Sequence, residues 1–268
     1  MTRPTSPSAP ITTLTLAGGF ASTVSWPATQ ILIDHVGWRG AYLVYAALLG
    51  FLAAPLHAFA LPRLRAHYAT PEISEPDIKI APLLPARGMA FALVAAAFAC
   101  YAFVPSALSA QLLAIFERFG LSPSVVVAIG MLFGPAQVLA RVCELAFART
   151  LHPLWIARFS VGLLVAAFAL LLLLKFSAPV AACFAVMYGM ANGLMTIARG
   201  TVPLTLFGAA GYGRLVGRIG GPFLAVQAMA PVVLSYVDDR FSDVAGLTLV
   251  AGFAGVALLC FAAIRRSA

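Results

Sequence analysis

Residues 33–50 read IDHVGWRGAYLVYAALLG. A polar and aromatic cluster opens this stretch and lies between two long apolar runs. The four residues of the cluster are Asp34, His35, Trp38 and Arg39. Such a cluster is typical either of a catalytic site or of the water-facing turn of a membrane hairpin. Trp and Tyr are enriched where lipid meets water, so Trp38 and Tyr42 favour the turn. We therefore predict that residues 34–39 form a tight outer turn between two spans.

The composition indicates a membrane protein. The chain of 268 residues is 62% hydrophobic and 10% charged, and its mean hydropathy is +0.98. Soluble domains usually contain about 25% charged residues, and their interiors have too little room for so much apolar surface. The apolar runs are about twice the length of a barrel strand. The predicted fold class is therefore all-α and polytopic.

Eight apolar runs are long enough to cross about 30 Å of hydrocarbon. They cover residues 11–33, 40–61, 89–112, 122–141, 154–174, 179–198, 217–237 and 245–264. An even number of spans places both termini on one side of the membrane. Most of the 17 Lys and Arg residues lie in the segments on that side. The positive-inside rule assigns it to the cytoplasm, which explains the net charge of +8 without a nucleic-acid partner.

The polar segments divide the chain into parts. Residues 1–10 are predicted to be a disordered tail. Residues 62–88 contain five prolines and mixed charges, which indicates a cytoplasmic linker. Two spans, within residues 11–61, precede this linker. A six-helix bundle is predicted within residues 89–268.

Two motifs resemble the major facilitator superfamily. Gly37, Trp38, Arg39 and Tyr42 resemble the link between its fifth and sixth helices, particularly in bacterial monocarboxylate and oxalate/formate-type members. The stretch GPAQVLARVCELAFART (residues 134–150) is similar to the turn between helices eight and nine. The linker matches the loop that joins the two halves of such carriers. The resemblance extends over nearly the whole chain from about residue 11.

The resemblance implies a secondary active transporter that moves a small solute by alternating access. It places the chain in the bacterial cytoplasmic membrane, with the lipid bilayer and a small-molecule solute as partners. The subfamily and the arginines favour an organic anion, and efflux of hydrophobic drugs is the other open alternative. The eight spans would correspond to helices five to twelve of a twelve-helix fold. We therefore expect a truncated carrier or its remnant, which a further chain could complete.

The second motif supplies candidates for an inner gate. Arg141 and Glu144 are three residues apart, so on a helix they lie on one face and are close enough to pair. The resemblance adds Gly134 and Arg149 to the gate. The alternative is that Arg141 and Glu144 form an interfacial anchor pair without a gating role.

Polar side chains within the spans are candidates for lining a solute path. These are Gln30, Gln111, Asn192 and Gln227. Each could instead hold two helices together by a hydrogen bond, and such bonds contribute about 1 kcal/mol or less.

Two other classes of protein are weighed against a transporter. An eight-span enzyme would need a cluster of chemically active residues, and the nearest is Asp238, Asp239 and Asp243. That segment is more simply interpreted as a solvated turn that caps the next helix. A membrane interaction protein that transports nothing is the other class. The scattered Cys and His residues indicate no disulfide framework, metal site or cofactor.

Overall fold

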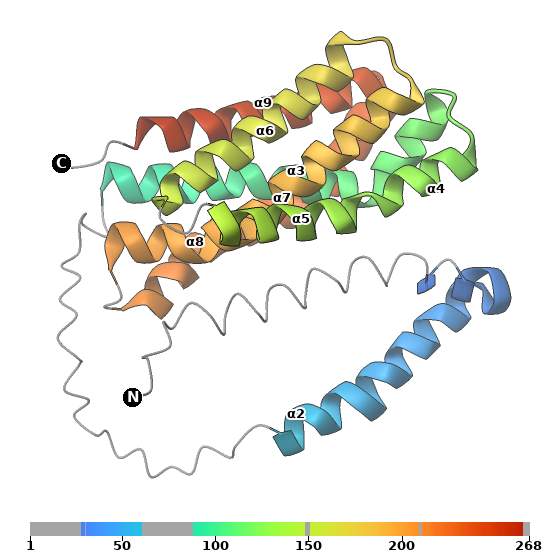
Figure 1. Cartoon of the computed structure of the whole chain (residues 1–268), viewed down its shortest axis with the longest axis horizontal. Helices are drawn as coiled ribbons and strands as arrows, with labels where there is room; N and C mark the ends of the chain where they lie inside the picture. The colour runs from blue at the N-terminus through green and yellow to red at the C-terminus, as the bar shows by residue number, and fades with distance from the viewer. Residues whose placement is uncertain (1–27, 30, 61–87, 148–150, 209–210, 265–268) are drawn as a thin grey trace. The chain divides into compact units, whose positions relative to one another are not determined.

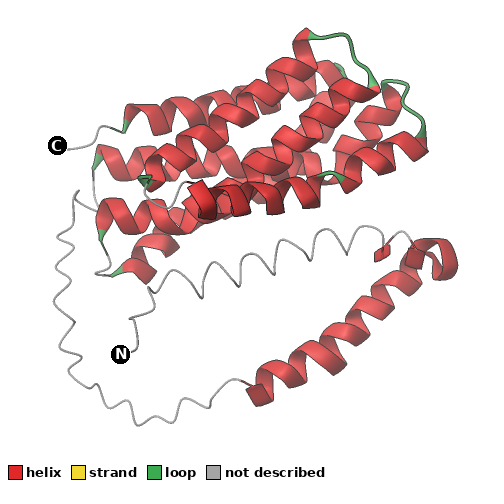
Figure 2. Ribbon diagram, in the orientation of Figure 1, coloured by secondary structure: helices red, strands yellow, loops and turns green. Residues whose placement is uncertain are grey.

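The computed structural model describes residues 28–29, 31–60, 88–147, 151–208 and 211–264. Within these ranges every regular element is a helix (Figure 2). Seven described helical runs are long and apolar enough to cross a membrane. A bilayer offers no water to backbone groups, so only elements that satisfy their own amides can span it. The predicted all-α polytopic membrane fold is confirmed. Of the eight predicted spans, 11–33 lies mostly outside the described residues.

The described residues belong to two compact units, which are considered separately: residues 28–60 and residues 88–264. The smaller unit is a helical run from Ile31 that passes through a π-helical turn, η1 (Leu49–Ala53), into α2 (Ala54–Ala60) (Figure 1). The predicted tail of residues 1–10 lies outside the described part of the chain. So does nearly all of the predicted linker.

The predicted turn at residues 34–39 is helical in the structure. One helical run, Ile31–Phe59, includes these residues, so the helix that contains the predicted second span begins before residue 40. The run is nevertheless bent, because Gly37 has a φ of 70°. A Cβ built on Gly40 would lie 2.7 Å from the Cβ of Val36, much closer than in a regular helix. The change of direction is therefore made inside the helix, where glycine tolerates a positive φ.

The described part of the larger unit consists of seven helices. Their bounds are α3 (Met89–Arg118), α4 (Pro123–Met131), α5 (Phe133–Phe147), α6 (Pro153–Leu173), α7 (Ala178–Phe207), α8 (Tyr212–Arg240) and α9 (Asp243–Ala263). Helices α4 and α5 together make one candidate span, Pro123–Glu144. Helices α3, α7 and α8 are each about 30 residues long, which exceeds the 20 or so that a bilayer requires.

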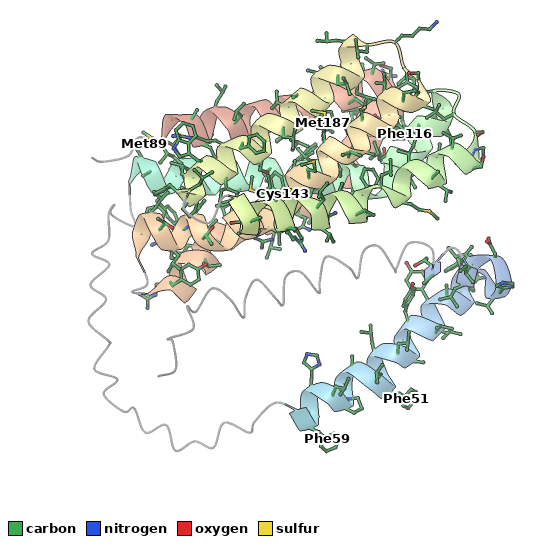
Figure 3. The ribbon with its side chains drawn as sticks, in the orientation of Figure 1. Phe51, Phe59, Met89, Phe116, Cys143 and Met187 are labelled. Atoms are coloured by element: carbon green, nitrogen blue, oxygen red, sulfur yellow. The ribbon has the colours of Figure 1, made fainter. Side chains whose placement is uncertain are left out.

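The helices of the larger unit pack in a series. The most extensive contacts run from α5 to α7, then to α6, α9, α3 and α8. Figure 1 shows α6 and α9 on one side of this unit and α5 and α8 on the other. Buried phenylalanines fill the interior, and the ring centroids of Phe98 and Phe261 are 5.3 Å apart. Phe116, labelled in Figure 3, lies 6.1 Å from Phe184.

Two glycines bring α7 close to α5. A Cβ on Gly189 would lie 2.8 Å from the carbonyl oxygen of Phe133, and one on Gly193 would lie 2.6 Å from that of Gln137. The two glycines are four residues apart and so lie on one face of the helix. This is the spacing of small residues that lets membrane helices approach closely. Backbone contact between α5 and α7 therefore depends on the absence of a side chain at both positions.

An arginine from α6 completes the end of α9. The Nε atom of Arg158 donates to the carbonyl oxygen of Phe261 at 3.0 Å. Its Nη2 atom donates to those of Ala262 and Ile264 at 3.3 and 2.7 Å. The last carbonyls of a helix have no partner within the helix, and a cation satisfies both their hydrogen bonds and the negative end of the helix dipole.

We predict that Gly193→Ala destabilises the protein, whereas Gly200→Ala on the same helix does not. At Gly193 the methyl group meets backbone, at a cost of about 1–3 kcal/mol. No neighbouring atom lies within 4 Å of a Cβ built on Gly200, and there alanine stabilises the helix by about 0.5–1 kcal/mol relative to glycine. The apparent melting temperature of the purified protein in detergent measures both effects. Equal shifts for the two variants would contradict the close contact.

Candidate functional site

One side of the larger unit is covered by none of the helices that the structure describes in it. Helix α5 packs on α7 and helix α8 packs on α3, but there is little or no packing between α5 and α8. We call this side the open face: α5 and α8 form its rims, and α3 and α7 lie between them. Helix α8 is the least buried candidate span of this unit. Several polar side chains of the described spans lie on the four helices of the open face.

A hydrogen bond joins α3 to α7 at the open face. The hydroxyl of Tyr101 donates to the Oδ1 atom of Asn192. The Nδ2 atom of Asn192 donates to the carbonyl oxygen of Tyr188 at 2.9 Å, within α7. Tyr101 is buried, and Asn192 is half-buried. A buried tyrosine normally needs a partner for its hydroxyl, and Asn192 supplies one from the neighbouring helix.

A second polar link joins α5 to α7. The Nη2 atom of Arg141 donates to Oγ1 of Thr196 at 3.4 Å, and that hydroxyl donates to the carbonyl oxygen of Asn192 at 2.9 Å. Arg141 is only 6% exposed, whereas Thr196 is exposed. Asn192 and Thr196 are four residues apart, so α7 presents both on one face. Together with Tyr101, these side chains form a polar strip across three helices.

The contact between α3 and α8 depends on a proline. Pro231 has no amide hydrogen, so the carbonyl oxygen of Gln227 loses its usual helical partner. The hydroxyl of Ser106 donates to that oxygen at 2.6 Å. The Nε2 atom of Gln111 donates to the carbonyl oxygen of Pro231 at 3.4 Å. Gln111 therefore holds two helices together, which is the alternative weighed for it from the sequence, and the side chain of Gln227 is exposed.

Of the four gating candidates, the three that the structure describes all lie on α5 but have different surroundings. Gly134 is buried near the start of α5, and Arg141 hydrogen-bonds to Thr196 as described. Glu144 lies at a cavity between α5, α6 and α7. The pairing of Arg141 with Glu144 stays a prediction. Arg149 and the lining candidate Gln30 lie outside the described residues.

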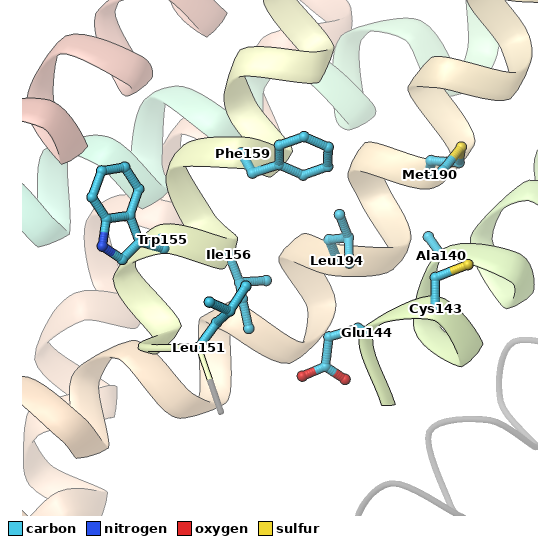
Figure 4. A pocket seen from close by; sticks show the side chains of 9 residues that line it. All are labelled: Ala140, Cys143, Glu144, Leu151, Trp155, Ile156, Phe159, Met190 and Leu194. Atoms are coloured by element: carbon cyan, nitrogen blue, oxygen red, sulfur yellow. The ribbon is translucent and has the colours of Figure 1, made fainter. Parts of the chain in front are cut away.

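The cavity beside Glu144 has a volume of about 470 Å³. Figure 4 shows its mouth, with Trp155 and Phe159 from α6, Met190 and Leu194 from α7, and the Glu144 carboxylate at one end. The lining is almost entirely apolar. No set of three His, Cys, Asp or Glu residues suited to a metal ion occurs in the part of the chain that the structure describes.

Sequence reasoning missed three contributors to the open face: Tyr101, Thr196 and Ser106. Their partners come from other helices, and Tyr101 on α3 is 91 residues from Asn192 on α7. Two signals were present. A tyrosine inside an apolar run needs a partner, and a proline inside a helix frees the carbonyl four residues earlier.

A family model described as Major Facilitator Superfamily matches residues 7–221, which is more than half of the chain. The chain belongs to the major facilitator superfamily. Comparisons with curated proteins and with solved structures gave no match. Membership makes the protein a multi-pass membrane protein of a transporter family, as the seven apolar helices of its described residues also indicate.

We predict that Tyr101 and Asn192 of this superfamily member are energetically coupled. In a double-mutant cycle, Tyr101→Phe and Asn192→Leu each remove one partner of the bond. The expected coupling is about 0.6 kcal/mol and at most about 1.7 kcal/mol, the range of interhelical hydrogen bonds in membranes. The measurement is the free energy of unfolding in mixed micelles. Tyr236→Phe is the control, because that side chain is 65% exposed and the change should stay within about 0.5 kcal/mol. Additive effects at positions 101 and 192 would contradict the bond.

Proposed function

We propose that the protein is a secondary active transporter of a small organic anion, and that the open face forms one wall of the solute path. It acts by alternating access in the bacterial cytoplasmic membrane, with both termini in the cytoplasm. The observation that supports this best is the polar strip of Tyr101, Asn192, Arg141 and Thr196. Polar groups within membrane spans are costly, and they commonly mark substrate or ion pathways.

Thr196 is the member of the strip that a solute can reach most directly. Its side chain is exposed on α7, and it lies next to the charged group of Arg141. A carboxylate at Thr196 would be attracted by the guanidinium, and it would accept the hydroxyl proton in place of the carbonyl oxygen of Asn192. Asn192, one turn away, offers a further polar group to the same solute.

Arginines near one end of the open face support an anionic solute. Arg199 follows Thr196 on α7, and its guanidinium carbon lies 3.9 Å from the ring centroid of Phe223 on α8. Arg218 on α8 lies 5.4 Å from the ring centroid of Phe91. Both side chains are exposed. By the positive-inside assignment this is the cytoplasmic end, so the arginines would raise the local concentration of anions at the cytoplasmic mouth.

Glu144 and Arg141 are proposed as parts of an inner gate, together with Gly134 and Arg149. They lie toward the same end of the unit as the arginines. In this proposal their charged contacts form in one state and separate in the other. The solute path also needs an opposite wall, which we propose is supplied by the other helical half of the carrier, from this chain or from a further chain.

The test is uptake of radiolabelled oxalate, formate and lactate by the full chain reconstituted in liposomes. We expect counterflow of at least one of them above protein-free liposomes. Thr196→Val keeps the shape of the side chain but removes its hydroxyl, and should lower uptake about tenfold, the loss expected for one hydrogen bond to a charged group. Thr248→Val on α9 is the matched control. Its hydroxyl is also exposed and also donates to a carbonyl oxygen four residues earlier, at 2.7 Å, but α9 is not one of the helices of the open face.

Three results would count against the proposal. Equal uptake by the two threonine variants would remove Thr196 from the path. Efflux of a cationic dye such as ethidium, without uptake of any of the three anions, would indicate that the solute is a hydrophobic drug and not an organic anion. No movement of any probe, together with stable binding of a second membrane protein, would favour the interaction protein over the transporter.

A further inference from the structure

Asp238 is a buried carboxylate at the end of α8. Its side chain is 6% exposed, and neither oxygen has a hydrogen-bond partner among the described residues. The expectation that this turn caps the next helix is confirmed, but its three aspartates are not all solvated. Only Asp239 is exposed. The cap of α9 comes from Ser242, whose hydroxyl oxygen accepts from the amide of Ala245 at 3.1 Å.

A missing side chain on α9 makes room for this carboxylate. A Cβ built on Gly246 would lie 1.8 Å from Oδ1 of Asp238 and 2.8 Å from Cδ1 of Leu234. No alanine could occupy position 246 with Asp238 in place. The carboxylate therefore sits in a niche between α8 and α9, beside Gly246 and Leu234 and largely out of water.

Arg118 at the end of α3 is the cation that faces the niche. It binds Asp243 through Nε, at 3.0 and 2.9 Å from the two carboxylate oxygens, and through Nη2 at 2.6 Å. These hydrogen bonds raise the pKa of Arg118, so the guanidinium stays charged. Its distance to Asp238 is 3.8 Å, which is too long for a hydrogen bond.

Arg118, Asp238 and Asp243 meet at one corner of the unit, and their charges do not cancel. One guanidinium faces two carboxylates, Asp238 from α8 and Asp243 from α9, and the neighbouring Asp239 adds a third negative charge in water. Asp243 has three hydrogen bonds from Arg118, whereas Asp238 has none. Burial without any hydrogen-bond donor favours the neutral form of this carboxylate, and it opposes the attraction of Arg118, which is shared with Asp243.

We propose that Asp238 is a proton-binding site, in which the carboxylate takes one proton from water and is held in the Gly246 niche as a neutral acid. With that proton bound, Arg118 and Asp243 form a neutral pair, and only the solvated Asp239 keeps its charge. A metal ion is a poorer occupant, because Arg118 already lies against the carboxylates and the described residues contain no set of metal ligands.

Loss of the proton would change the packing of this corner. The new buried charge must either draw Arg118 away from Asp243 or move into water, and movement into water separates α8 from α9 at Gly246. Helix α8 also forms one rim of the open face, so gain or loss of the proton at Asp238 would shift the position of that rim. That last link depends on the proposed transport function, whereas the proton site itself does not.

The test is infrared spectroscopy of the full chain in lipid nanodiscs. At about pH 5 exposed aspartates are ionised, since their usual pKa is about 3.9. We expect the carbonyl stretching band of a protonated carboxylic acid at this pH and its loss at high pH. Asp238→Asn should remove the band, whereas Asp239→Asn, at the exposed neighbouring position, should leave it unchanged.

Gly246→Ala provides a second test that keeps every acidic residue. It should expel the carboxylate from the niche and remove the band at about pH 5. Gly252→Ala on the same helix, where nothing lies within 4 Å, should retain it. Absence of the band in the unmodified protein, its persistence in Asp238→Asn, or its equal loss in Asp239→Asn or Gly252→Ala would overturn the proposal. If Asp238→Asn does not fold, the glycine pair decides the question.

Discussion

Hydrocarbon supplies no hydrogen bonds, and the rest of this structure depends on that constraint. The backbone of each span satisfies itself by forming a helix. Polar side chains must then find partners on other helices, and in the described bundle they do so in a small number of places. Tyr101 pairs with Asn192, Arg141 with Thr196, and Arg158 with the last carbonyls of α9. Each of these bonds joins two helices and so defines how they pack.

The close approach of α5 and α7 determines where the polar groups lie. Gly189 and Gly193 let the two backbones touch, and this brings Arg141 on α5 within reach of Thr196 on α7. The same order of packing leaves α5 and α8 apart. The open face and its polar strip are therefore consequences of one arrangement, in which small residues bring helices together and polar residues gather on the uncovered side.

Membership of the major facilitator superfamily gives this arrangement a functional context. A transporter needs a surface where a polar solute can replace some of its water contacts, and a way for helices to move around that surface. The exposed hydroxyl of Thr196 beside the buried Arg141 suits the first need. The corner of Arg118, Asp238 and Asp243 differs from the open face, because its one buried carboxylate lacks a donor. At the open face the polar groups are paired across helices, whereas at this corner a buried carboxylate has no donor.

The sequence by itself determined the fold class, the family and most of the spans, because hydropathy and span length act locally along the chain. The motif with Gly37, Trp38 and Arg39 indicated the family correctly, although its predicted turn is a bend within a helix. Asn192 and Gln111 were recognised as polar groups, but their roles depended on Tyr101 and Pro231 from distant helices. Only the tertiary structure decided that Asp238 is buried while Asp239 is exposed. The reason is physical: burial and pairing depend on which helix lies opposite, and adjacent residues of a helix face in different directions.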